Sequence, residues 1–183
     1  MNYTLRKISA PIAAVCLAVA PGCYATEYFT IEQAQQVCFP TATKFVEEHV
    51  LFTEEQKKLI ESASGVSVNA NAQKIWKVVG AESVIGWFVV DYVIGKHLLI
   101  DYAVAVDING LVKEVEILAY RESYGGEVKE QRWLSQFRGK SKNSALALYD
   151  DITNISGATL SSRSVTEGIK RILATLDVTK SKK

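Results

Sequence analysis

Residues Asp151 to Leu176 read DITNISGATLSSRSVTEGIKRILATL, and this stretch decides how the rest of the chain is arranged. It joins a run of small residues, Ser156-Gly157-Ala158-Thr159, to a segment whose apolar side chains recur at helical spacing. Positions i, i+4, i+7, i+8 and i+11 lie on one face of an amphipathic helix. They are Val165, Ile169, Ile172, Leu173 and Leu176. The stretch therefore predicts a C-terminal helix that packs on the protein with one side and brings Thr159 into its first turn.

The junction between the small residues and this helix favours an anion. The first backbone N–H groups of a helix lack partners within the helix, and the helix dipole adds partial positive charge there. Small residues let a phosphate approach the backbone, and the hydroxyls of Ser156, Ser161 and Ser162 can donate hydrogen bonds to it. The same residue types are common where a helix simply follows a turn. The residues alone leave a phosphate site and an ordinary helix start as alternatives.

Residues 1–25 have the pattern of a secretory signal peptide. Arg6 and Lys7 precede an apolar run over residues 8–20. The small residues Cys23 and Ala25 then occupy the −3 and −1 positions of a cleavage site after Ala25. The apolar run is too short for an ordinary transmembrane helix. We expect cleavage after Ala25 and export to the periplasm. Processing as a lipoprotein at Cys23 is a minor alternative.

Length and composition limit the possible functions. The 183 residues suit one modest domain with a core, and a net charge of +1 gives no electrostatic case for nucleic acid. There is no paired-carboxylate site, nucleophile elbow, dinucleotide-binding fingerprint or Cys/His cluster, so we expect no catalytic residue and no metal site. Cys38 lies in an apolar stripe and is expected to be buried and inert. Residues 178–183 read as a solvated basic tail.

Residues 26–72 are predicted to form a helical lead-in. Thr30 begins a capping box for a first helix, which should end before Pro40. A second helix is predicted over residues 41–50. Thr53 begins another capping box for a third helix, which should end near Gly65.

Residues 73–177 are predicted to form the main domain, which begins with strands. Segments rich in Val, Ile, Trp and Tyr are separated by turn signals, and Asn109-Gly110 favours a hairpin. The expected strands are Lys74–Gly80, Ser83–Val93, Leu98–Val106 and Leu111–Tyr120. The carboxylates of Asp91, Asp101 and Asp107 are expected to face solvent. The predicted fold class is α+β, with an antiparallel sheet packed by N-terminal helices and the C-terminal helix.

Several motifs in order along the main domain resemble those of a known family. They are the hairpin YAVAVDINGLVKEVEIL, the loop ESYGGEV, the segment WLSQFRGK and SGATLSS followed by a short amphipathic helix. Together they are similar to the FMN-binding domain of the flavin-carrying subunits of bacterial Na⁺-translocating quinone reductases and Rnf complexes. The resemblance extends from Gly95 to Leu176.

The resemblance implies a cofactor and a site. In that family the last threonine of the small-residue motif carries FMN through a phosphoester bond, made by a flavin transferase that uses FAD; here that residue is Thr159. It further implies that Glu122 orders the loop of residues 124–126. Tyr124 or Trp133 would stack on the ring or, equally, belong to the core. The residues expected around the phosphate are Ser156, Gly157, Ala158, Ser161 and Ser162, and those expected near the isoalloxazine or ribityl chain are Tyr124, Gly125 and Gly126. The family usually has Asp where this chain has Thr153.

The resulting expectation is an exported electron-carrier flavoprotein rather than a self-contained enzyme. Its partners would be the flavin transferase and an unidentified electron donor and acceptor, soluble or membrane-bound. Two alternatives remain open at this point: a reductase that binds FMN without a covalent bond, and a periplasmic binding or scaffold module without flavin.

Overall fold

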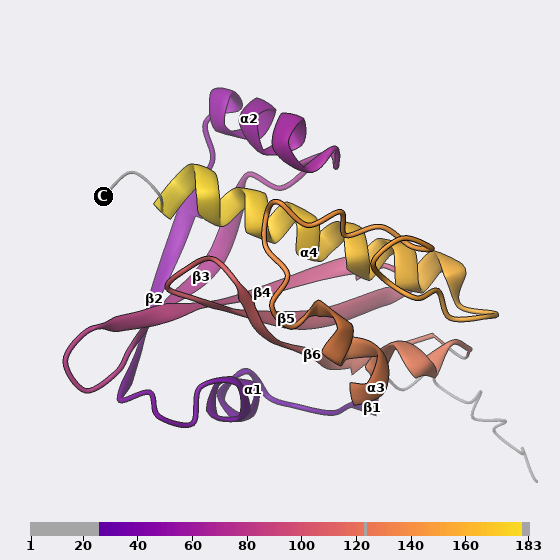
Figure 1. Ribbon diagram of the computed structural model, residues 1–183, viewed down its shortest axis with the longest axis horizontal. Coiled ribbons are helices and arrows are strands. Elements are labelled where there is room, and N and C mark those ends of the chain that lie inside the picture. Colours follow the sequence, from indigo (N-terminus) through magenta and orange to yellow (C-terminus); the bar gives the residue numbers. More distant parts are fainter. Residues whose placement is uncertain (1–25, 123, 181–183) are drawn as a thin grey trace, which may run out of the picture.

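The computed structural model describes residues 26–122 and 124–180, which form one antiparallel sheet with helices on both faces (Figure 1). The sheet has six strands in the order β1-β6-β5-β4-β3-β2, and each neighbouring pair is antiparallel. The strands are β1 (Thr26–Glu27), β2 (Lys44–Leu51), β3 (Ala72–Val79), β4 (Val84–Ile94), β5 (Leu99–Asp107) and β6 (Val112–Tyr120). The α-helices are α1 (Ile31–Cys38), α2 (Glu54–Ser64), α3 (Gln131–Leu134) and α4 (Thr159–Lys180). The α+β prediction is confirmed, and the predicted signal peptide lies outside the described residues.

Helix α4 covers one face of the sheet, and α1 covers the other (Figure 1). All five apolar residues of the predicted stripe are buried, from Val165 to Leu176. They pack with the inward side chains of the central strands, including Ile100 and Val115. The helix continues to Lys180, past the predicted end of the domain at 177, and the ammonium of Lys180 contacts the carboxylate of Glu48 on β2. In the part of the chain that the structure describes, no helix is long and apolar enough to cross a membrane.

One close approach fixes α4 over the sheet. Gly168 faces Tyr102 of β5, and a Cβ at Gly168 would lie 2.2 Å from the Tyr102 hydroxyl oxygen. That hydroxyl donates to Asp91 Oδ2 at 3.3 Å, and Arg171 of α4 donates to the same oxygen at 2.8 Å. The prediction of a solvent-facing Asp91 is therefore wrong, since only 12% of its side chain is exposed. Burial and the nearby carboxylate raise the pKa of Tyr102 well above its usual value.

The prediction of a helix over residues 41–50 is wrong, because Lys44–Leu51 form strand β2 at the edge of the sheet. Phe45 packs beside Phe39 and Phe88 on the α1 face, whereas Val50 packs on the α4 face. Successive residues of a strand point to opposite faces. Strand β2 therefore contributes side chains to the hydrophobic clusters on both faces of the sheet. The pairing with β3, in register from Lys44 opposite Val79, outweighs the local helical pattern.

The remaining predictions of local structure are largely confirmed. Thr30 and Thr53 cap α1 and α2 with complete capping boxes, and Gly65 ends α2 at φ +68°. Strands β3 to β6 lie within two residues of their predicted bounds. Cys38 is buried, and burial raises the pKa of its thiol to about 12, so it stays protonated and unreactive at neutral pH.

The Gly168–Tyr102 contact predicts the effect of Gly168→Ala. Helix propensity alone would make Ala stabilising by about 1 kcal/mol, but the added methyl must displace the buried phenol. We expect a net loss of about 1–3 kcal/mol in the free energy of unfolding, measured by urea denaturation. Adding Tyr102→Phe should recover part of the loss. Glu167→Ala, on the exposed side of the same helical turn, is the control, and a stabilised Gly168→Ala protein would contradict this account.

Candidate functional site

The site is the N-terminus of α4, where Thr159 is the first helical residue. The loop that leads to it is held by the segment after β6. Trp133 Nε1 donates to the Thr153 carbonyl at 2.8 Å, and Gln136 Oε1 accepts from the Thr153 N–H at 2.8 Å. Ile152 anchors the same loop, since only 1% of it is exposed. Two of the motifs quoted from the sequence are thus in direct contact.

The Thr159 hydroxyl has a defined partner. Asn154 Nδ2 donates to Thr159 Oγ1 at 3.0 Å, while Asn154 Oδ1 is buried without a hydrogen-bond partner. A buried polar atom without a partner is rare in a folded protein, and such an atom is usually satisfied by a water, an ion or a ligand. Ala158, which precedes the helix, has no side-chain oxygen to cap it. The N–H groups at this helix start therefore remain suited to an anionic ligand.

Thr159 lies in a pocket of about 580 Å³ at the surface. This volume falls within the range of roughly 300–1,000 Å³ that is usual for small-molecule sites. Gly157 has φ +82°, a conformation that a residue with a side chain adopts only with strain. The pocket is lined by Tyr149, Asp150, Ile152, Thr153, Asn154, Ser156, Gly157 and Thr159.

Tyr149 is the aromatic residue of this pocket and has an unusual backbone. Its φ is +69°, a left-handed conformation that costs about 1–3 kcal/mol for a bulky residue. Its side chain is nevertheless 75% exposed, so burial of the ring does not compensate for this cost. Strain of this kind is concentrated at functional sites, where the surrounding structure holds it in place.

The predicted loop 122–126 lies against the other side of the small-residue motif. A Cβ on Gly125, at φ +78°, would lie 2.6 Å from Ala158 Cβ, so the two backbones are closely packed. The Tyr120 hydroxyl donates to the Tyr124 carbonyl and fixes the loop, leaving the Tyr124 ring 86% exposed. Gly126 lies near Lys129 instead. None of the three predicted loop residues lines the pocket around Thr159, and Ser123 lies outside the described residues.

Glu122 was expected to order the loop of residues 124–126. In the structure it holds the turn between β4 and β5 instead. Its carboxylate accepts from the N–H groups of His97 and Leu98, the latter at 2.9 Å. Desolvation raises the pKa of Glu122, but these N–H groups stabilise the charged form more strongly, and the pKa lies below its usual value.

Ser161 and Ser162 do not reach the pocket, contrary to the prediction. They are 3% and 0% exposed. Because each helical residue is rotated from the one before it, Ser161 and Ser162 lie on the side of α4 that faces the sheet, away from the side of Thr159. The Ser162 hydroxyl donates to the Ala158 carbonyl at 2.9 Å, and Ser161 hydrogen-bonds to Tyr120. Both serines therefore stabilise the first turn of α4 from its buried side.

Trp133 is a core residue rather than a stacking partner. It is 5% exposed, and its ring meets Phe137 edge-on with centroids 5.1 Å apart. The pocket residues that sequence reasoning missed are Asn154 and Tyr149. Asn154 lies in the stretch 151–176 quoted first, where it was given no role, and Tyr149 lies two residues before that stretch. An aromatic residue within ten positions of Thr159 was a usable signal.

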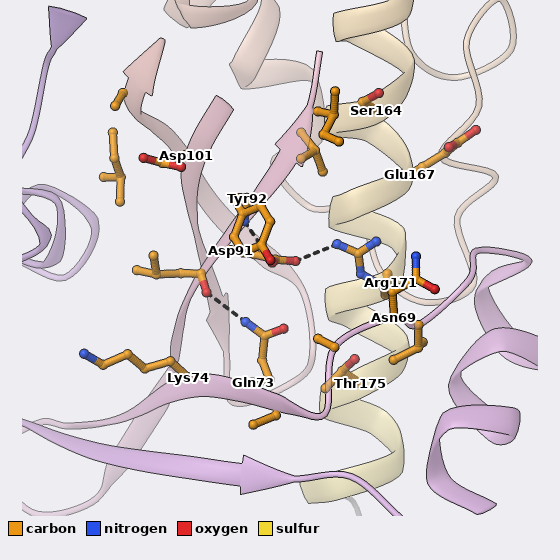
Figure 2. Close-up of a pocket in the computed structure, with 18 of the residues that line it drawn as sticks. Asn69, Gln73, Lys74, Asp91, Tyr92, Asp101, Ser164, Glu167, Arg171 and Thr175 are labelled. Atoms are coloured by element: carbon orange, nitrogen blue, oxygen red, sulfur yellow. Dashed lines mark hydrogen bonds and ion pairs between the residues drawn. The ribbon is translucent and has the colours of Figure 1, made fainter. Parts of the chain in front are cut away.

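A larger pocket of about 840 Å³ lies beside the middle of α4 (Figure 2). Figure 2 shows Arg171 reaching from the helix to Asp91. Gln73 Nε2, also in this pocket, donates to the Val90 carbonyl at 2.8 Å. The arginine and this aspartate neutralise each other. Within residues 26–122 and 124–180, no group of three or more His, Cys, Asp or Glu side chains is arranged to hold a metal. The small-residue motif and the Asn154–Thr159 contact lie outside this larger pocket, and the candidate site is the pocket that contains them.

Residues 95–174 match the sequence profile described as the FMN-binding domain. The crystal structure of Shewanella oneidensis NqrC has a similar fold, with a TM-score of 0.52 and 17% sequence identity, over 78% of this chain and 84% of that one. No curated protein sequence matches the chain. The match to the FMN-binding domain includes the whole small-residue motif and the first sixteen residues of α4.

The residues present fit the phosphate of FMN. An anion at Thr159 would meet the uncapped N–H groups of α4, and Arg163 lies one turn further on the same side of the helix. The amide Nδ2 of Asn154, which donates to Thr159 Oγ1 at 3.0 Å, is the side-chain donor beside the hydroxyl. Asp150 is the one carboxylate that lines this pocket, and it is exposed, so water screens its repulsion of a phosphate.

The close packing of Gly125 on Ala158 predicts the effect of Gly125→Ala. The added methyl, together with the positive φ, should push the motif away and destabilise the protein by about 1–3 kcal/mol. Hydrogen exchange should then be faster at the amides of residues 156–162. Gly126→Ala is the matched control, because its Cβ would meet nothing closer than 3.7 Å. Equal exchange in the two variants would contradict the proposed contact.

Proposed function

We propose, from the premise that residues 95–174 form a domain of the FMN-binding domain family, that the protein carries FMN covalently on Thr159 and relays electrons between redox partners. The observation that carries the proposal is the position of Thr159. It is the first residue of α4, lies in a surface pocket, and has its hydroxyl oxygen held by Asn154.

Bound FMN would supply the one- and two-electron chemistry. The protein's own residues would hold and orient it. Thr159 Oγ1 would form the ester, and the N-terminal N–H groups of α4 would stabilise the negative charge of the phosphate. Asn154 would fix the direction of Oγ1 and leave the hydroxyl proton free to depart.

Attachment requires FAD and a flavin transferase. Thr159 Oγ1 would attack the phosphorus on the riboflavin side of the FAD pyrophosphate, and a new P–O bond would form. The P–O bond to AMP would break, and AMP would leave with the electron pair. The hydroxyl proton would pass to a base of the transferase or to water. No oxidation or reduction occurs in this step.

A covalent anchor suits a protein outside the cytoplasm, where a dissociated flavin would be lost by dilution. We place the protein in the periplasm on the pattern of residues 1–25, with lipid attachment at Cys23 as the less favoured form. Its proposed partners are the flavin transferase and two redox proteins, a donor and an acceptor, soluble or membrane-bound.

The proposal predicts that Thr159→Ala abolishes flavin attachment. Wild-type protein expressed with a flavin transferase should gain the mass of one FMN, mapped to the peptide that contains Thr159. Ser164→Ala, which removes a hydroxyl from α4 outside this pocket, is the matched control and should still be labelled. Full labelling of Thr159→Ala would refute covalent attachment at this residue, and colour lost on acid precipitation of the wild type would favour non-covalent FMN.

The role given to Asn154 predicts a kinetic defect. Asn154→Ala should fold, because the side chain is only partly buried, but Thr159 Oγ1 would lose its fixed direction. One hydrogen bond is worth about 0.5–1.5 kcal/mol, so labelling should slow roughly 2- to 10-fold. The measurement is the initial rate of FMN incorporation by mass spectrometry, with Thr153→Ala as control. An unchanged rate would show that Asn154 does not position the hydroxyl.

A further inference from the structure

Two exposed tyrosines lie on the two loops next to the small-residue motif. Tyr124, 86% exposed, belongs to the loop that packs on Ala158. Tyr149, 75% exposed, belongs to the loop that leads to α4. Only Tyr149 shares the pocket of about 580 Å³ with Thr159. A ligand anchored on Thr159 therefore has open space beside Tyr149.

The gap between Gly125 and Ala158, on the side of the motif that carries the Tyr124 loop, is closed. Gly125 approaches Ala158 so closely that a single added carbon would overlap with it, at 2.6 Å. The Tyr124 carbonyl is fixed by the Tyr120 hydroxyl, so the loop is held in this position. A planar ring system cannot enter between these two backbones without separating them.

The loop that carries Tyr149 is held firmly. Tyr149 N–H donates to the Ile152 carbonyl at 3.0 Å, and the N–H of Ala147 donates to Asp151 Oδ1 at 3.0 Å. Asp151 is also paired with Lys140 at 2.9 Å. Leu146 and Ile152 are buried at the two ends of the loop. The structure thus holds a solvent-exposed aromatic ring on a rigid loop, in a backbone conformation that disfavours it.

We propose that Tyr149 is the aromatic residue that stacks on the isoalloxazine ring of the bound flavin. The ring would then lie in the pocket between Tyr149 and Asn154 and not on the loop at Tyr124. This inference rests on the proposed attachment of FMN at Thr159. The ribityl chain would extend from Thr159 along the pocket, and the electron-rich phenol would stack on the electron-poor flavin ring. The sequence expectation that residues 124–126 contact the ring is replaced by this assignment.

The test compares Tyr149→Ala with Tyr124→Ala in full-length protein labelled by a flavin transferase. A stacked phenol quenches flavin fluorescence and gives the bound flavin a visible circular dichroism band. We expect Tyr149→Ala to raise the fluorescence per flavin severalfold and to weaken the dichroism, while Tyr124→Ala leaves both unchanged. Tyr149→Phe should keep the dichroism band, because it keeps the ring.

A second variant separates the stacking role from a structural one. Asn tolerates positive φ better than Tyr, so Tyr149→Asn should fold at least as stably as the wild type and still show the high fluorescence. Unchanged fluorescence in both Tyr149→Ala and Tyr149→Asn would overturn the inference, as would an equal or larger effect of Tyr124→Ala. Each variant is first shown by intact mass to carry one FMN, so that the fluorescence is compared at equal flavin content. Wild-type protein that acquires no flavin would instead contradict the proposed function itself.

Discussion

The position of α4 on the sheet is the constraint on which the rest of the structure depends. Gly168 allows the helix to meet the Tyr102 hydroxyl, and the Asp91 carboxylate joins that hydroxyl to Arg171 one turn further along. Because a helix is rigid over this length, the same contacts determine where its first residue, Thr159, lies. A polar cluster buried under the middle of the helix thereby positions a hydroxyl at its end.

The two sides of the helix start serve different purposes. Gly125 packs against Ala158 and closes one side, supported beneath by Ser161 and Ser162. The other side stays open as the pocket, with Asn154 and Tyr149 on its wall. Under the proposed function, the closed side would give the Thr159 ester a fixed direction, and the open side would leave room for the flavin ring to exchange electrons with partners.

Much of the fold was predictable from local signals. The capping boxes at Thr30 and Thr53 and the apolar stripe of α4 depend on neighbouring residues, which a sequence displays directly. Strand β2 was mistaken for a helix because its side chains serve two cores, and its state is decided by pairing with β3. The motif predicts that Thr159 begins the helix, and the structure has it there, whereas the inward direction of Ser161 and Ser162 follows from the rotation of the helix relative to the sheet. Asn154 and Tyr149 reach the site through a loop conformation that no spacing rule predicts.

The central claim is that Thr159 is esterified to FMN in the native protein. Intact-mass spectrometry of the protein isolated from its own cells, followed by mapping of the peptide that contains Thr159, tests it most directly. The account predicts a yellow protein whose mass exceeds that of the processed polypeptide by one FMN, with the label on Thr159. A colourless protein with the mass of the bare polypeptide would contradict it.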